Sequence, residues 1–265
     1  MRIFRISSLS SSFVSICLVA CNTVTVVAPQ PQIEAPIVPG AGRHEVHFGG
    51  VPAKQVSFSS DASSRPPSFA NQNVSDSHDL PVGGGIGLGS YFELGAQYGI
   101  NSGGAGLKLK FQPVGPTATQ LKAGAWLIAA FGHVSGASRS RSGEQEIVGG
   151  PGGFPWSSNA NLTIAGGGGS VGFMIADKDL LYVGYSYDNY VANASIHQDP
   201  ASNGSSGAAD VSTQQFGYAQ AVGLHFRLLL GSGFVDLGYA ATHFVFGTLN
   251  PADNHGLSAI AGTGF

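Results

Sequence analysis

Apolar and polar residues alternate along the chain from Val82 onward. Between residues 82 and 100 the large apolar side chains occupy even positions, whereas glycine and polar side chains occupy most odd positions. A repeat of two residues is the pattern of a β-strand whose two faces meet different surroundings. The same repeat returns at 107–111, 119–134, 161–176, 180–195, 213–230, 234–248 and 256–265. The pattern therefore predicts eight strands.

The connections between these strands differ in length in a regular way. Counted back from the C-terminus, 231–233, 177–179 and 112–118 form short turns at one end of the predicted sheet. The longer loops 249–255, 196–212 and 135–160 form the other end, where 101–103 is a short exception. Short turns on one side and long loops on the other are typical of outer-membrane barrels, in which the turns face the periplasm.

The composition supports a sheet that meets lipid on one side. Charged residues make up 10% of the 265 residues, against about 25% in ordinary soluble domains. No apolar run approaches the roughly 20 residues that a membrane-spanning helix requires. We therefore expect an all-β fold, a closed antiparallel up-and-down transmembrane β-barrel at 82–265. It would have about eight strands, or ten if residues 43–58 form a hairpin.

The first 20 residues have the pattern of an export signal. Arg2 and Arg5 precede a short apolar stretch that ends in Leu18-Val19-Ala20-Cys21. That ending resembles the lipobox of bacterial lipoproteins. The resemblance implies cleavage before Cys21 and its diacylation, which would anchor the protein stably in a membrane. An ordinary signal peptide without lipidation is the alternative.

Residues 21–81 are rich in proline and serine. Pro29, Pro31, Pro36 and Pro39 lie close together, and proline at this density cannot join a β-ladder and favours extended, solvated backbone. Residues 59–81 have the composition of a polar loop. The sequence thus predicts a lipidated, disordered N-terminal tether and loop with possible short strands before the barrel.

The last residues resemble the C-terminal signature of outer-membrane barrels. Leu257, Ala259 and Ala261 alternate before the terminal Phe265, although Thr263 departs from the apolar pattern. The resemblance implies a location in the outer membrane of a Gram-negative bacterium, among its lipids. It also implies recognition by the barrel-assembly machinery through Phe265.

Charged strand residues fall on the face opposite the apolar one. Hairpin register places Glu93 opposite Lys110 and Arg227 opposite Asp236, and Lys122 follows on the next strand. A barrel of eight strands is just wide enough to be filled by side chains, so interior charges must be paired. We expect a structural network of ion pairs, with a narrow conduction path or gate as the alternative.

The predicted loop 135–160 is the best candidate for a contact surface. Loops carry much of the binding in proteins, and this one contains Arg139, Arg141, Phe154 and Trp156. Its partner would be a protein or another surface ligand. A nucleic-acid partner is not expected, because the formal net charge is −3 and no basic stripe could neutralise phosphates.

Catalytic and cofactor chemistry find little support. Both cysteines lie in the leader, and the histidines are not spaced as metal ligands, so we expect no metal or cofactor. His133, His197, His243 and His255 lie near strand ends or loops, but no nucleophile, base and acid can be nominated together. We therefore expect a non-enzymatic structural or surface-interaction role.

Two other functional classes stay open. One is a soluble, surface-exposed lipoprotein barrel that turns its apolar face inward and binds a protein partner. The other is a narrow pore or an outer-membrane enzyme that modifies lipid A, for which His133 would be the first residue to replace.

Overall fold

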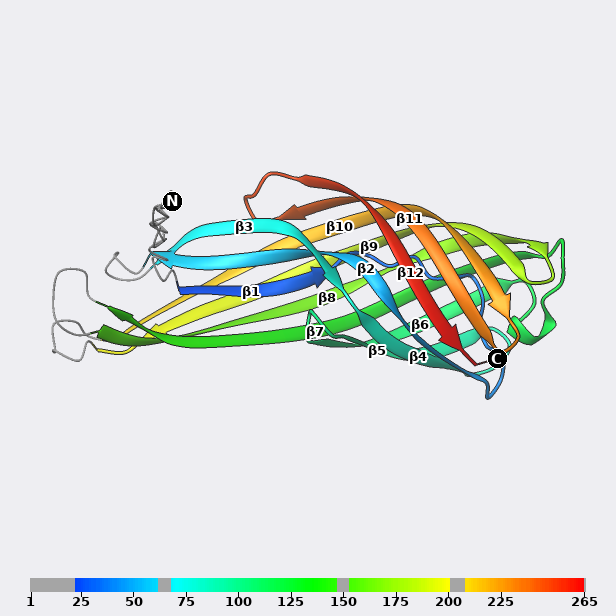
Figure 1. Ribbon diagram of the computed structural model, residues 1–265, viewed down its shortest axis with the longest axis horizontal. Helices are drawn as coiled ribbons and strands as arrows, with labels where there is room; N and C mark the ends of the chain where they lie inside the picture. Colours follow the sequence, from blue (N-terminus) through cyan, green and yellow to red (C-terminus); the bar gives the residue numbers. More distant parts are fainter. Residues whose placement is uncertain (1–21, 62–67, 147–152, 201–207, 265) are drawn as a thin grey trace, which may run out of the picture.

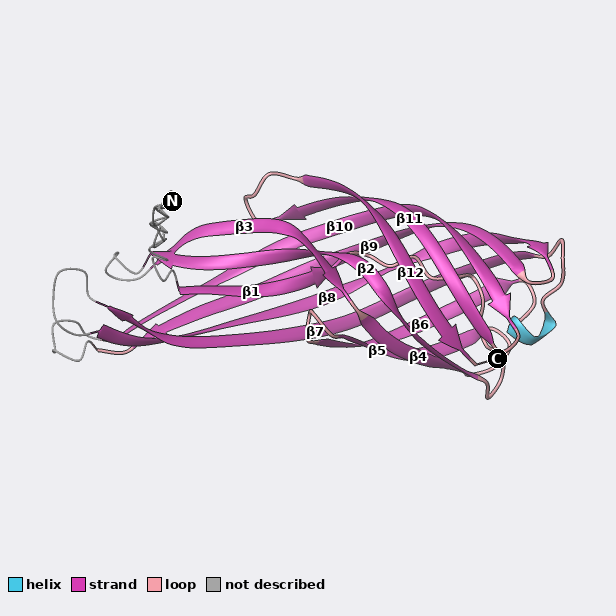
Figure 2. Cartoon of the chain, viewed as in Figure 1, coloured by secondary structure: helices cyan, strands magenta, loops and turns pink. Residues whose placement is uncertain are grey.

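The computed structural model describes residues 22–61, 68–146, 153–200 and 208–264. The described chain is almost entirely β-strand (Figures 1 and 2). The strands are β1 (Asn22–Pro29), β2 (His44–Asp61), β3 (Ser68–Asp79), β4 (Pro81–Gly87), β5 (Phe92–Gly99), β6 (Gly104–Val114), β7 (Trp126–Glu146), β8 (Gly153–Ala176), β9 (Asp179–Gln198), β10 (Ala209–Leu230), β11 (Gly233–Phe246) and β12 (Ala252–Thr263), with the short 3-10 helix η1 (Ala118–Gln120) before β7. No helix in this part of the chain is long and apolar enough to cross a membrane.

The strands close into an antiparallel barrel. Each strand from β4 to β12 pairs with the next one along the chain. The ring is closed by β2, which pairs with β12 through residues 46–50 and with β4 through residues 44–48. The ring therefore contains β2 and the nine strands β4 to β12. This is the all-β, up-and-down barrel that the alternation predicts, with ten strands, the larger of the two numbers considered.

The two strands beyond eight do not come from a hairpin at residues 43–58. The predicted strand 82–100 is divided into β4 and β5 by a turn at residues 88–91, in which Gly89 has φ 148°. A turn of four residues keeps even positions on the same face of both strands, so the alternation passes through it without a break. The tenth strand of the ring is β2, whose distal part pairs with β1 and β3.

The proline-rich segment lies inside the barrel, and the prediction of a solvated tether is corrected at this point. Residues 30–43, here called the luminal segment, connect β1 to β2; residues 30–40 run through the interior, and the exposed residues 41–43 lead into β2. Ile33, Ala35 and Ile37 are buried against side chains of the barrel wall. Because prolines need no ladder partner, this extended backbone can be held by side chains instead. Tyr190 donates to the carbonyl of Pro29, Ser170 to that of Glu34 and Lys110 to that of Ile37.

The outward face of the barrel changes character along its length. Near the short turns and the C-terminus the outward side chains are large and apolar, and we call this ring the apolar band. On β10 Val222 and Leu224 are 60% and 51% exposed in the band, whereas Ser212 and Gln214 at the far end of the strand are polar. The far end, on the left of Figure 1, is called the distal half. It consists of β1, β3 and the adjoining ends of β2 and β7–β11.

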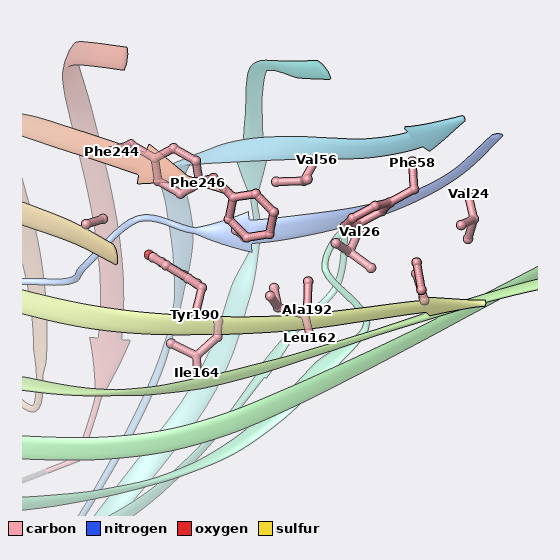
Figure 3. Packing of buried hydrophobic residues seen from close by; sticks show 14 residues of the cluster. Val24, Val26, Val56, Phe58, Leu162, Ile164, Tyr190, Ala192, Phe244 and Phe246 are labelled. Carbon is pink, nitrogen blue, oxygen red and sulfur yellow. The ribbon is translucent and has the colours of Figure 1, made fainter. Parts of the chain in front are cut away.

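The inward face is mixed in the band, where apolar and charged side chains are both buried, and mainly apolar in the distal half. Along β9 the inward positions run from Leu180 and Tyr182 near the short turn, through Ser186 and Asp188, to Tyr190 and Ala192 in the distal half. Tyr190 and Ala192 belong to a core between the β1–β2–β3 sheet and the ends of β8–β11, in which Val26, Phe58, Leu162 and Phe246 lie close together (Figure 3). The distal half is thus organised like a water-soluble sandwich, with polar outside and apolar inside.

The loops at the distal end are shorter than predicted. The predicted loop 135–160 is mostly a hairpin, because β7 continues to Glu146 and β8 begins at Gly153. Its residues still alternate with period two, but polar side chains replace apolar ones on the outward face, so the apolar signal of a strand is absent. The short turns at 177–178 and 231–232 lie at the opposite end, near the C-terminus (Figure 1).

Candidate functional site: the charged lumen

A cluster of charges joins the luminal segment to the barrel wall. The Nζ atom of Lys108 lies 2.8 Å from Oε2 of Glu34, and Nζ of Lys110 lies 3.4 Å from the same oxygen. Glu93 completes the cluster, 3.1 Å from Lys110 and 3.7 Å from Lys108. Charges removed from water persist only when they are paired. The structure brings together Glu93 and Lys110, which are direct partners in the β5–β6 register.

A second cluster forms around Arg227 on β10. Its Nε atom lies 2.8 Å from Oδ2 of Asp236 on β11, its predicted register partner. Asp236 also accepts a hydrogen bond of 2.7 Å from the hydroxyl of Tyr182. Nη1 of Arg227 lies 3.6 Å from Glu45 of β2, so this cluster spans β2, β9, β10 and β11. The guanidinium group also lies 4.0 Å from the centre of the Phe234 ring.

Glu34 and Glu45 were missed by sequence reasoning, and Lys122 was misplaced. Glu34 is the one charged residue between Asn22 and Gly42, a signal that an isolated acid in an apolar, proline-rich stretch needs a buried partner. Lys122 is exposed in the connection before β7 and does not enter the lumen. The predicted strand 119–134 in fact begins at Trp126, because residues 115–125 contain η1 and its flanking loops.

A cavity of about 70 Å³ remains between the luminal segment and the wall formed by β5–β9. His133, Ser135, Lys108 and Asp188 contribute to its lining. Nε2 of His133 lies 3.1 Å from Oδ1 of Asp188, which would orient and stabilise an imidazolium. No hydrogen bond joins Ser135 to His133 among the described residues, so the contact that activates a nucleophile is not formed there.

The predicted contact residues of the 135–160 region are not gathered on one outer surface. Trp156 is 6% exposed and faces the interior of the distal half, and the Phe154 side chain lies outside the described residues. Arg139 donates to the carbonyl of Asn101, and Arg141 donates to that of Thr23 at 3.4 Å. Both arginines line a cleft between β1 and β7. Cys21 and Phe265, for which lipidation and recognition are predicted, also lie outside the described residues.

Aromatic pairs mark both edges of the apolar band. Trp126 and Phe173 lie 4.9 Å apart, and Phe92 and Phe111 lie 4.8 Å apart, both close to the short turns. At the distal edge Tyr187 and Tyr218 stack at 5.9 Å. Aromatic residues gather at the two membrane–water interfaces of transmembrane barrels. The three pairs thus lie at the two edges of the apolar band.

Comparisons with known proteins add little to this geometry. No protein-family model matches the chain, and no curated protein matches it significantly. The solved structure of Ail, the attachment invasion locus protein of Yersinia pestis, is similar at 11% identity and a TM-score of 0.31, over 85% of this chain and 99% of that one. The outer membrane channel DcaP of Acinetobacter baumannii is similar at 8% identity and a TM-score of 0.18, over 92% and 98% of the two chains. At these scores neither similarity carries an argument about function.

Proposed function

We propose that this chain is a bacterial outer-membrane β-barrel that its own luminal segment closes and whose distal half serves as a surface-interaction module. The observation that carries the proposal is the reversal of polarity along the strands. Each long strand presents apolar side chains outward in the band and polar side chains outward in the distal half, as β10 does with Leu224 and Ser212. Lipid around the band and water around the distal half account for both.

The extent of the apolar band favours a membrane over water. Phe48, Phe216 and Leu107 are 63%, 62% and 58% exposed, on three different strands of the ring. Soluble monomers rarely expose apolar patches larger than a few hundred Å². Closure of the ring leaves no free strand edge in the band, as the absence of water in lipid demands. These features favour the membrane-spanning barrel over the soluble lipoprotein barrel.

The short turns and long strand extensions support an orientation. In outer-membrane barrels short turns face the periplasm, so the distal half would extend outside the cell. Asn22 pairs with Ser60 at the distal end, so the N-terminal end of β1 would lie on the outer side of the membrane, together with Cys21. Phe265 would stay on the periplasmic side, where the barrel-assembly machinery could bind it.

The occupied lumen and the packed distal core support an interaction role without catalysis. The luminal segment takes the space through which solutes would pass, and its Glu34 is tied to the wall by two lysines. The distal half has its own apolar core and can hold a fixed outer surface for a ligand. The proposed partner is a ligand on the outer side of the membrane, at this distal half.

Two lysine substitutions on the same strand and the same face test the membrane assignment. Leu224→Lys places a charge in the band, and Ser212→Lys is its matched control in the distal half. In lipid the first should cost about 2–4 kcal/mol, whereas the second should stay within about 0.5 kcal/mol. Unfolding in urea after reconstitution measures both. Equal stabilities of the two variants would contradict a lipid-facing band.

A further inference from the structure

The outward face of the distal half over β7–β10 carries rows of neutral polar side chains. Strand register places Ser140, Asn159, Ser195 and Ser212 side by side across the four strands. The next row toward the membrane consists of Ser138, Asn161, Asn193 and Gln214. With strands about 4.8 Å apart and alternate residues about 6.8 Å apart, hydroxyl and amide groups form a regular lattice.

Most of this hydrogen-bonding capacity is unused within the protein. Nε2 of Gln214 donates to Oδ1 of Asn193 at 2.9 Å, and this is the one side-chain hydrogen bond between members of the two rows in the described structure. Hydroxyl and amide groups can both donate and accept. The face therefore offers donors and acceptors in close alternation to whatever lies against it.

Charges on this face are few, and those at its distal margin are paired with one another. His197 lies 2.6 Å from Asp210 and 3.1 Å from Asp199 at its distal margin. Arg141 touches its edge and donates to the Thr23 carbonyl. A hollow of about 330 Å³ is lined by Ser142, Ser157 and Asn159, among others. No cluster of one charge sign is present in the described part of this face to attract an ion.

The face is backed by the apolar core of the distal half. The alternate residues of the same strands, including Ala160, Leu162 and Ala194, are buried in the distal core. A ligand would therefore meet groups that are already positioned, which lowers the entropy cost of binding.

We propose that this face, the neutral lattice of Ser, Asn and Gln side chains on β7–β10, binds a neutral saccharide chain of the glycan layer on the cell's own surface. Sugar hydroxyls match alternating donors and acceptors without requiring charge. Serine is depleted at protein–protein interfaces, which favour aromatic residues and arginine, so a protein partner fits this face less well. The inference rests on the proposed function, because the orientation in the membrane places the face in that glycan layer.

The test uses the full-length protein in lipid nanodiscs and isothermal titration. The probe is the lipid-free neutral polysaccharide prepared from the cells that carry the protein, with heparin as the anionic comparison. The double variant Asn161→Ala/Asn193→Ala removes two neighbouring amides, and both positions are exposed. Asn73→Ala/Ser75→Ala, on the exposed face of β3, is the matched control.

The wild type and the β3 control should bind the neutral polysaccharide equally, and the Asn161/Asn193 variant at least about tenfold more weakly. Affinity should not change when NaCl rises from about 0.05 M to about 0.5 M, because only charge-driven binding is screened. Absence of binding, equal binding by all three proteins, or preference for heparin that disappears in salt would overturn the inference.

An unheated SDS gel of the same preparation separates the two proposals. A heat-modifiable barrel that binds no saccharide overturns this inference alone, whereas absence of the shift counts against the proposed barrel.

Discussion

The ammonium group of Lys108 on β6 lies 2.8 Å from the carboxylate of Glu34, and this contact ties the N-terminal luminal segment to the barrel wall. Glu34→Ala would leave Lys108 and Lys110 with Glu93 as their single carboxylate in this cluster. Removal of one partner from a buried ion pair costs about 3–5 kcal/mol. We expect a loss of that size in urea unfolding of the reconstituted protein. Gln32→Ala, two residues away in the same segment, is the matched control and should change stability little.

The same variants test whether the luminal segment closes the barrel. In planar bilayers the wild type and Gln32→Ala should show no steady conductance, whereas Glu34→Ala should show brief openings as the segment loosens. Steady conductance of the wild type would contradict closure and support a narrow pore.

The pair formed by Arg227 and Asp236 should behave as a coupled unit. Asp236→Ala leaves Glu45 as the one carboxylate near the buried guanidinium group of Arg227. We expect the free energy of unfolding to fall by about 3–5 kcal/mol. Arg227→Met alone should also destabilise the protein, because the buried carboxylate of Asp236 then loses the guanidinium group beside it. Asp236 would keep the hydrogen bond from Tyr182. The double variant should lose clearly less than the sum of the two single losses. Additive losses in a double-mutant cycle would show that the 2.8 Å contact carries no coupling.

The histidine at the distal margin should titrate above its ordinary range. Hydrogen bonds that the His197 ring donates to Asp210 first, and then to Asp199, raise the pKa of His197 above its usual value of 6.5. Because the pKa is higher in the folded state, the contact contributes its full stabilisation of the strand ends at pH values below the unfolded-state pKa. This stabilisation is lost as the pH rises through the folded-state pKa. NMR titration should give a midpoint above 6.5, and Asp210→Asn should lower it. A midpoint that does not respond to this substitution would refute the assigned cause.

Sidedness can be read from two exposed serines at opposite ends of the barrel. In a Cys21→Ser background, Ser140→Cys in the distal half should react with a membrane-impermeant maleimide on intact cells. Ser232→Cys, in the turn between β10 and β11, should react only after permeabilisation. The reverse pattern would mean that the distal half faces the periplasm.

The alternation of residues was enough to predict the barrel and the register of its hairpins. Glu93 with Lys110 and Arg227 with Asp236 could be paired because a turn of known length determines which residues are opposite. The division of residues 82–100 escaped detection, since the four-residue turn at 88–91 preserves the even–odd phase.

The luminal segment and the distal half could not be predicted for a different physical reason. A proline-rich backbone is expected to need water for its carbonyl groups. Here side chains such as Lys110 and Ser170 donate hydrogen bonds to those carbonyl groups inside the barrel. The residues of the distal half keep the period of two but carry polar side chains on the outward face, which is apolar in the band. Such a strand has no single apolar face along its whole length, so the sequence predicts a loop at 135–160 where the structure has most of a hairpin.

The boundary between lipid and water along β10 is the most direct test of this account. Nitroxide labels would be attached singly at the outward positions from Ser212 to Leu230, and their accessibility to oxygen and to a water-soluble nickel complex would be compared in reconstituted protein. We expect water accessibility at Ser212 and Gln214, a change near Tyr218, and lipid exposure at Val222, Leu224 and Phe226. Water accessibility at every position would contradict the membrane-spanning band and would favour a soluble barrel.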